Sequence, residues 1–544
     1  MSTAVIADTN LRVAEPRKES LPQGGGGGFK DWFVNGDNRI GTIYHGKMAY
    51  RRREWRGLKC TWADFVEWLK LWGVMLRFTS MAPVKIFKSF FEYRWMASYL
   101  SAPAFVDKMS QGQRGALHKI SRKQFAAIVQ QGTVYIAQML KADARFGADK
   151  KLSKRIVLFD EMTMIQIMGG FPNLIGIPYQ LMPVFLLSEL DQLSCIPYID
   201  AIESFGLPSE TCPVPTSEAG AAVIDAYPHC GAVFISSSMP CDGSLMASSY
   251  QSRRFKLPTY HLTFPVRYDD EDTLEAGAED VKGCIKFIEE HTGEKFDWDA
   301  YFEVIRRFNR ETKLELERWE INRTPYPQVT GSTQSLWREF MYQIEGGIHP
   351  ELEKVYKDCN EIMLKAYRKK DKVSRSSRYR ALVWNCPAHY YANFSSWAEN
   401  CWGINVLADM EILNFTKELE IEDKEEAIRD LARLYERMVM RKHTNGGYEH
   451  VLNELWRMVE AYKVDMVFLY QHVACKTLSG LQGLFDDQAR ERGVPLIWIE
   501  HDLMDPRTIS RQEMRSKVNN FMFNVFQAEP SDASLLDFDD ANTW

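Results

Sequence analysis

The feature that most constrains the fold of this chain is an alternation of short strand-like runs with amphipathic helical stretches, which starts near residue 155. Runs rich in β-branched and aromatic residues lie at 155–161, 230–238, 257–266, 380–387, 404–410, 464–473 and 494–502. Helical periodicity lies between them at 272–293, 423–442 and 446–463. Because strands that alternate with helices form parallel sheets, we predict an α/β fold. We expect two Rossmann-like or flavodoxin-like parallel-sheet lobes, with a ligand cleft between them at the carboxyl ends of the strands.

Composition divides the 544-residue chain further. Residues 29–150 are rich in aromatic and basic side chains, and Trp62, Phe65, Val66 and Leu69 recur at helical spacing. We expect this block to pack on its own protein or on a partner subunit, with an anionic membrane surface as the alternative. The predicted segments are a disordered Gly-rich tail (1–28), a helical extension (29–150), a first α/β lobe (151–270), a helical connector (271–377) and a second α/β lobe (378–544).

The overall composition disfavours several classes of protein. The formal net charge is −6, whereas nucleic-acid proteins usually carry a basic excess. The ten cysteines form no dense spacing pattern, so an extracellular disulfide scaffold is not expected. Residues 1–20 lack the apolar core of a signal peptide, and we therefore predict a cytoplasmic protein with reduced thiols.

Residues 162–187 carry no charged side chain and are long enough to span a bilayer. The same stretch contains Gly169, Gly170, Pro172 and Pro178, among other helix breakers. A lone helix in lipid does not tolerate so many breakers, because the freed backbone groups find no partner there. We predict a buried helix, a tight loop and a strand here, and no membrane span.

Three cysteines are the candidate ligands for a metal cofactor. Cys212 lies in a loop flanked by prolines, whereas Cys241 and Cys475 each follow a predicted strand and precede a predicted helix. Loops at the carboxyl ends of parallel strands converge on a cleft, and helix N-termini stabilise thiolates. Thiolates bind iron–sulfur clusters and zinc. Spacing alone also fits small buried hydrophobic residues, because the chain has no Cys-x-x-Cys pair.

Residues 472–523 resemble the end of subunits of the 2-hydroxyacyl-CoA dehydratase and benzoyl-CoA reductase family, such as the D-component of 2-hydroxyglutaryl-CoA dehydratase. In that family a strand leads to a cysteine and a helix. A Gly-Val-Pro strand follows, then an acidic turn similar to 502–507 and a helix with an arginine similar to Arg515. Residues 253–271 are similar to the centre of the family, and the resemblance covers about residues 155–530.

The resemblance implies that Cys212, Cys241 and Cys475 ligate a [4Fe–4S] cluster between the two lobes. In the family the fourth iron binds water, substrate or another cysteine. The candidates for that fourth thiolate in this chain are Cys230, Cys386 and Cys401.

The resemblance also implies a reaction and its partners. One electron enters the thioester carbonyl of a 2-hydroxyacyl-CoA, and the resulting ketyl radical anion expels the α-hydroxyl group. The acidified β-proton is then lost and the electron returns to the cluster, which leaves an enoyl-CoA. The implied partners are the acyl-CoA substrate, a second related dehydratase subunit and an ATP-hydrolysing iron–sulfur activator protein. This chain has no G-x-x-x-x-G-K-[ST] phosphate loop, so we expect it to receive electrons rather than to drive their transfer.

Polar residues near the cysteines are candidate catalytic groups. Ser237 and Ser238 precede the second cysteine and either orient the substrate or cap the next helix. His472 lies three residues before the third cysteine and either donates a hydrogen bond to the cluster or substrate or is structural. Glu161 ends the first strand and is either an acid–base group or a helix cap.

Basic and acidic residues of the last turns have similar alternatives. We expect Arg507 and Arg515 to pair with carboxylates rather than with CoA phosphates.

We predict a hydro-lyase subunit from these features together. The alternatives are a benzoyl-CoA reductase-type subunit that reduces an aromatic acyl-CoA, a non-catalytic electron-relay subunit, and a metal-free α/β binding protein.

Overall fold

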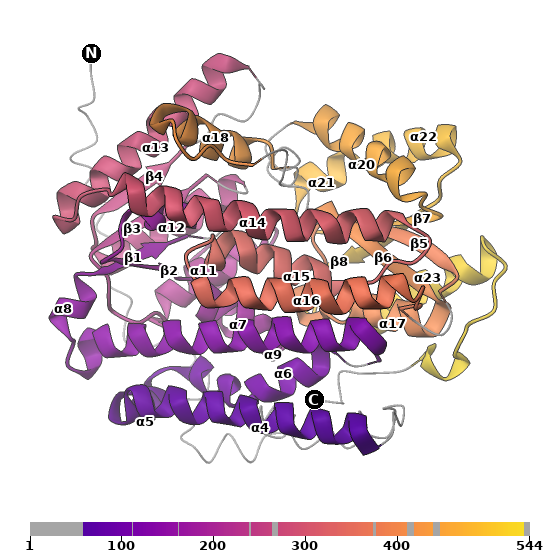
Figure 1. The fold of residues 1–544 in the computed structure, drawn as a ribbon, viewed down its shortest axis with the longest axis horizontal. Helices are drawn as coiled ribbons and strands as arrows, with labels where there is room; N and C mark the ends of the chain where they lie inside the picture. Colours follow the sequence, from indigo (N-terminus) through magenta and orange to yellow (C-terminus); the bar gives the residue numbers. More distant parts are fainter. Residues whose placement is uncertain are drawn as a thin grey trace.

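The structure, a computed structural model, describes residues 58–110, 112–160, 163–238, 241–263, 270–373, 377–410, 418–438 and 447–537. The predicted Gly-rich tail and Glu161 lie outside the described residues. In the described part of the chain, two four-stranded parallel sheets lie at the centre and helices pack around them (Figure 1). The prediction of an α/β fold with a helical N-terminal region is confirmed.

The first sheet has the strand order β2-β1-β3-β4. Its strands are β1 (Ile156–Phe159), β2 (Ile175–Pro178), β3 (Val233–Ser237) and β4 (Thr259–Leu262), and all neighbours are parallel. Every residue of β1 and β3 is buried, because helices cover both faces of a parallel sheet. The order places β1 and β3 at the centre, so that the turn after β3 opens at the middle of the sheet edge.

The second sheet has the matching order β6-β5-β7-β8. Its strands are β5 (Tyr379–Trp384), β6 (Ile404–Asp409), β7 (Met466–His472) and β8 (Leu496–His501), again all parallel. Side chains of β5 alternate between two separate apolar clusters, since successive residues of a strand point to opposite faces. Each strand predicted from the sequence is present in one of the two sheets.

The helices on the amino-terminal side are α4 (Leu58–Met81), α5 (Pro83–Glu92), η1 (Arg94–Ser101), α6 (Ala102–Met109), α7 (Gly115–Ala142), η2 (Ala144–Phe146), α8 (Lys150–Ser153), η3 (Ile165–Gly170), η4 (Leu181–Phe185), α9 (Leu186–Leu190), α10 (Ile196–Ser204), α11 (Pro213–Val223) and α12 (Asp242–Phe255). Those that follow are α13 (Glu271–Thr292), α14 (Trp298–Arg323), α15 (Ser332–Phe340), η5 (Met341–Glu345), α16 (Pro350–Arg368), η6 (His389–Tyr391), α17 (Phe394–Trp402), α18 (Lys424–Glu436), α20 (Tyr448–Tyr462), α21 (Lys476–Gly480), α22 (Gln482–Arg492), α23 (Arg511–Asn524) and η8 (Ala533–Leu535).

The uncharged stretch at 162–187 contains a 3₁₀ helix, η3, followed by a loop and the strand β2, which is the predicted order. Glycines in η3 allow close packing: a Cβ at Gly170 would lie 2.2 Å from the ring of Phe296. Among the described residues, no helix combines the length and the apolar composition that crossing a membrane requires.

Long helices connect the two sheets. Figure 1 shows α7, α14 and α16 running side by side across the molecule. Helix α14 contacts η3 next to the first sheet and also β6 and α20 of the second sheet. A rigid helix with contacts on both sides fixes the distance between the sheets, and with it the distance between their carboxyl-terminal loops.

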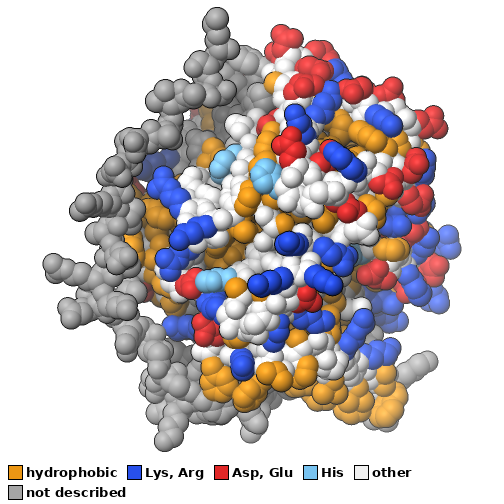
Figure 2. Space-filling model, turned by 90° about the vertical axis from the view of Figure 1, so that its left-hand side faces the viewer, with side chains coloured by type: hydrophobic (Ala, Val, Ile, Leu, Met, Phe, Trp, Pro, Cys, Tyr) orange, Lys and Arg blue, Asp and Glu red, His pale blue; other side chains and the backbone are white. Residues whose placement is uncertain are grey.

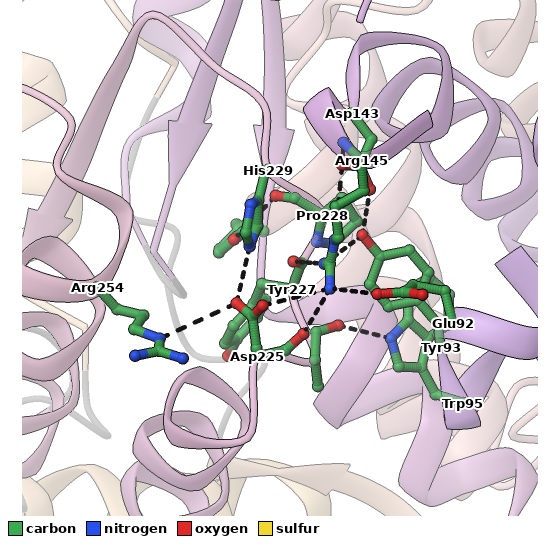
Figure 3. A network of polar contacts seen from close by, with 12 residues as sticks. Glu92, Tyr93, Trp95, Asp143, Arg145, Asp225, Tyr227, Pro228, His229 and Arg254 are labelled. Carbon is green, nitrogen blue, oxygen red and sulfur yellow. Dashed lines mark hydrogen bonds and ion pairs between the residues drawn. The ribbon is translucent and has the colours of Figure 1, made fainter. Parts of the chain in front are cut away.

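The amino-terminal helices pack on the first sheet. Leu71, Met75 and Phe78 of α4 belong to the same apolar cluster as residues of α7 and β1. Figure 3 shows how Arg145 ties the end of α5 to the loop before β3: it pairs with Glu92 at 3.3 Å and donates to the carbonyl of Asp225 at 3.1 Å. The described part of the helical extension therefore packs on its own protein.

Candidate functional site

The three predicted ligand cysteines each stand immediately before a helix. Cys212 precedes α11, Cys241 precedes α12 and Cys475 precedes α21. Cys241 also follows β3, and Cys475 follows β7. Each of these strands is one of the two central strands of its own sheet. The predicted succession of strand, cysteine and helix is therefore present at both sites.

Backbone N–H groups of the following helices point at two of the sulfurs. The N–H of Val214 lies close enough to the sulfur of Cys212, and those of Thr477 and Leu478 close enough to the sulfur of Cys475, to oppose the rise that burial causes in the pKa of each thiol. The first N–H groups of a helix have no partner inside the helix, so they favour negative charge on an acceptor at this position. These two cysteines are held where helix N–H groups favour the thiolate form.

Contacts between the two halves of the chain bring the cysteine loops together. Nε2 of His472 lies 3.3 Å from Sγ of Cys212, and Nζ of Lys476 lies 3.5 Å from Oε1 of Glu210. Glu210 is two residues before Cys212, and Lys476 is one residue after Cys475. The loop before α11 therefore lies against the turn before α21.

The third cysteine is positioned by a close helix contact. A Cβ added to Gly243, in the first turn of α12, would lie 2.8 Å from Cγ of Pro215 in the first turn of α11. The same Cβ would lie 3.4 Å from Sγ of Cys241. Only a glycine lets the two helix N-termini approach this closely, and their approach brings Cys241 beside Cys212.

The three thiols influence one another's ionisation. Burial, followed by the neighbouring thiol of Cys241 and more weakly that of Cys475, raises the pKa of the Cys212 thiol well above its usual value. Burial also raises the pKa of Cys475. Thiolates crowded into a buried site repel one another, so they require positive charge among the sulfurs.

The described residues contain no group of three His, Cys, Asp or Glu side chains arranged closely enough to hold a single metal ion. A lone ion needs its ligands to converge on one point. In an iron–sulfur cluster each cysteine binds a different iron, so the ligands stand apart by the width of the cluster.

Two buried histidines lie behind Cys212. Burial, followed by the charge of the other histidine, lowers the pKa of His472 to about 3, and burial lowers the pKa of His501 to about 4. Their rings are 5.7 Å apart. Both imidazoles are therefore neutral in the ordinary range of pH, and each has one N–H to donate. The sequence indicates both histidines as residues that could serve the site, and the fold places their rings next to each other.

The predicted serines lie at the end of β3. Ser237 and Ser238 are buried, and the backbone N–H of Ser238 donates to the carbonyl of Leu262 at 2.9 Å. Among the described residues, the hydroxyl of Ser238 has no hydrogen-bond partner. Neither serine is the N-cap of α12, because Cys241 has that position. The helix-cap interpretation of these two serines is therefore wrong.

The acidic turn after β8 also reaches the site. Asp502 accepts the backbone N–H groups of Met504 and Asp505 at 2.9 and 2.7 Å, and burial raises its pKa to about 6. Its carboxyl group is close enough to Cys212 to raise the pKa of that thiol. The acidic turn therefore forms one side of the cysteine site.

Arg507 connects this turn to the first sheet's helices. It pairs with Asp505 and, at 2.9 Å, with Asp200 of α10. The expected pairing of Arg507 with carboxylates is confirmed. Arg515 is buried and donates to the hydroxyl of Tyr391 at 3.0 Å. No sequence signal identifies Asp200, because it lies 307 positions from its partner.

The candidate fourth thiolates differ in their surroundings. Cys230 is buried and its nearest charged neighbour is Asp143, whereas Cys401 is buried beside Asp532. Cys386 is partly exposed, and its backbone lies close enough to His501 to raise the pKa of that imidazole. Of the three candidates, Cys386 has the contact that connects it to the histidines behind Cys212.

Two comparisons with known proteins bear on these residues. The family described as HGD-D, 2-hydroxyglutaryl-CoA dehydratase, D-component, matches residues 183–522, which is more than half of the chain. The matched range includes Cys212, Cys241 and Cys475 and both sheets' carboxyl-terminal loops after β3 and β7. A comparison with curated proteins finds no match. The chain belongs to the 2-hydroxyglutaryl-CoA dehydratase D-component family.

Proposed function

We propose that this chain is the cluster-bearing subunit of a radical-type 2-hydroxyacyl-CoA dehydratase and that Cys212, Cys241 and Cys475 hold a [4Fe–4S] cluster. Family membership supports a component of a 2-hydroxyacyl-CoA dehydratase, a hydro-lyase type of enzyme. The observation that carries the finer proposal is the convergence of three helix-capping cysteines from the loops of two sheets.

The donor set fits such a cluster. Cys241 and Cys475 both lie within electrostatic reach of Cys212, in a site where burial disfavours thiolates unless iron supplies positive charge. The N–H groups of Val214 and Thr477 lie close enough to favour negative charge on the sulfurs. A cluster bound here would supply one electron at low potential and an iron with an open position that acts as a Lewis acid.

His472 orients and stabilises this site. Its Nε2 is within hydrogen-bonding distance of the Sγ of Cys212, so the imidazole N–H can offset negative charge on that sulfur. His501 packs behind it and keeps water away from the second ring nitrogen. His472 therefore acts on the substrate reaction through a ligand sulfur.

Ser238 is the better candidate for contact with substrate. Its buried hydroxyl retains an unused donor among the described residues, three positions before Cys241. An unsatisfied buried hydroxyl is unfavourable until a partner arrives, and a substrate hydroxyl or thioester oxygen is a suitable one. Ser237 lies beside it in β3. Glu161 remains a predicted acid–base group.

The chain would not work alone. A subunit that accepts electrons needs a donor, for which we propose an ATP-hydrolysing iron–sulfur activator, and a second related subunit completes the enzyme. The cytoplasm stays the predicted location. In the electron-relay alternative, the partner subunit binds the acyl-CoA and this chain only passes electrons to it.

An anaerobic assay tests the proposal. The chain is purified with its partner subunit and activator, and is incubated with ATP, a reductant and a panel of 2-hydroxyacyl-CoA and aromatic acyl-CoA thioesters. The proposal predicts enoyl-CoA formation from a 2-hydroxyacyl-CoA, and a change in the cluster's paramagnetic resonance spectrum on substrate addition. Ring reduction without dehydration would contradict it. A spectrum unchanged by every thioester would assign the chain to electron relay.

A further inference from the structure

Helix α4 has a second apolar face that no described element covers. Leu71 and Met75 on one side are buried against α7. The other side carries an exposed row with helical spacing of three and four residues. Its members and their exposed fractions are Trp62 (67%), Phe65 (46%), Leu69 (49%), Trp72 (41%) and Leu76 (71%).

The row continues on α5. Val84, Phe87 and Phe91 are each about two thirds exposed, and the rings of Phe87 and Phe91 are 5.3 Å apart. Single exposed apolar residues are ordinary, but a contiguous patch marks an interaction surface. Figure 1 shows α4 and α5 along one edge of the molecule, and Figure 2 shows hydrophobic side chains gathered at that lower edge.

Helix α5, which carries three members of this row, is firmly attached. Nζ of Lys85 donates to the carbonyls of Lys141 and Gly147 at 2.5 and 2.8 Å. Beyond the end of α5, the hydroxyl of Tyr93 is bonded to the buried carboxyl group of Asp143 (Figure 3). The exposed phenylalanines therefore project from a fixed platform.

Exposed basic side chains lie on the same two helices as the apolar row, and one exposed acidic residue, Glu92, ends α5. Exposed cations on the two helices are Lys70, Arg77 and Lys88. Helix α8 and the turn after it follow Gly147 closely and add the exposed residues Lys150, Lys151, Lys154 and Arg155. The seven residues before α4, RRREWRG at 51–57, contain four basic residues and one acidic residue. Figure 2 shows Lys and Arg side chains above the apolar edge.

The charges around the α4–α5 face favour one kind of binding partner over another. A second copy of the chain packed through the same face would bring two basic rims together, which like-charge repulsion disfavours. Tryptophan and phenylalanine flanked by lysine and arginine are the side chains that enter the headgroup region of an anionic bilayer. We propose that the α4–α5 face attaches the protein to the surface of a membrane that contains anionic lipids.

Vesicle sedimentation tests this attachment with the full chain under anaerobic conditions. The vesicles are phosphatidylcholine alone, or phosphatidylcholine mixed with phosphatidylglycerol. We expect the protein to sediment with the mixed vesicles and not with the neutral ones, and salt to weaken the binding by screening. Failure of the unaltered chain to bind the mixed vesicles would overturn the proposal.

Variants locate the surface. Phe87→Ser combined with Phe91→Ser removes two exposed rings and should lower partitioning by about tenfold or more. Lys150→Glu combined with Lys151→Glu should lower binding to the mixed vesicles and should not change the result with the neutral vesicles. The matched control, Leu484→Ser, removes an apolar side chain that is 41% exposed on α22 and should leave partitioning unchanged.

Two further outcomes would contradict a lipid partner. Equal vesicle binding by the phenylalanine variant and the unaltered chain would place the contact elsewhere. A phenylalanine variant that changes the oligomeric mass in light scattering, with no vesicle binding by the unaltered chain, would assign the face to a protein partner. Neither result depends on whether the cysteines hold a cluster.

Discussion

The imidazole of His472 and the thiol of Cys212 lie 3.3 Å apart, although 260 positions separate them in the sequence. Cys212 precedes α11 near the first sheet, and His472 ends β7 of the second sheet. The contact therefore spans the boundary between the two sheets at their carboxyl ends. It also gives one thiol of the proposed cluster site a neutral hydrogen-bond donor.

Replacing His472 with glutamine should lower the reduction potential of the cluster while iron content stays unchanged. A hydrogen bond to a ligand sulfur stabilises the more negative, reduced state, so its weakening favours the oxidised state. Potentiometric titration followed by paramagnetic resonance measures the shift. The control is His229→Gln, at a half-exposed histidine paired with Asp225. An unchanged potential would show that the histidine is only structural.

Replacing Gly243 with alanine should reduce iron loading. The new Cβ would lie 2.8 Å from Pro215, so the N-termini of α11 and α12 must separate. We expect a loss of about 1–3 kcal/mol in the free energy of unfolding from overpacking. Gly483→Ala is the matched control, because nothing lies within 4 Å of its added Cβ. The iron content of both variants is measured. Full iron content in Gly243→Ala would contradict the predicted loss of iron.

The acidic turn offers a contrast between two carboxylates that share Arg507. Asp200 is largely exposed, so Asp200→Asn should cost at most about 1 kcal/mol of unfolding free energy. Asp505 is buried and also accepts the backbone N–H of Arg507. Asp505→Ala should therefore cost about 1–3 kcal/mol. Urea unfolding measures both, and equal losses would be inconsistent with this assignment.

Glu399 should make stability depend on pH. Burial raises its pKa to about 7 in the folded protein, from 4.5, while Thr330 donates to it at 3.0 Å. Between these values the folded state binds more protons than the unfolded state, so stability falls as the pH rises. Glu399→Gln should remove this loss, on the order of 3 kcal/mol between pH 4 and pH 8.

Thermal or urea unfolding of Glu399→Gln and the unaltered chain across that pH range checks the sign. The glutamine keeps an oxygen that can accept from the Thr330 hydroxyl, so the two proteins should agree in stability near pH 4. A variant that is less stable than the unaltered chain at pH 8 would show that Glu399 is ionised in the fold.

The local sequence was sufficient to predict the elements that carry the site. The apolar runs at β3 and β7 are buried on both faces, and a cysteine followed by a helix after each run is a purely local pattern. Cys241 and Cys475 could be placed for this reason. Cys212 was a weaker candidate, because its loop has no strand before it to indicate its direction, and the resemblance strengthened its assignment.

Contacts between distant segments could not be predicted in the same way. Asp200 meets Arg507 across 307 positions, and Glu210 meets Lys476 only because two loops from different sheets converge. The sequence assigned Ser238 two roles, and only the fold shows that Cys241 caps α12 instead. Burial of Glu399 likewise depends on how α17 packs, which no local pattern reports.

Iron and acid-labile sulfide per chain, measured after anaerobic purification, test the central claim most directly. The account predicts about four irons per chain, and loss of most of this iron when Cys212, Cys241 and Cys475 are all replaced by serine. Cys284→Ala, at a buried cysteine of α13, should retain the iron. A triple variant with full iron content, or an unaltered chain that purifies without iron and still dehydrates a 2-hydroxyacyl-CoA, would contradict it.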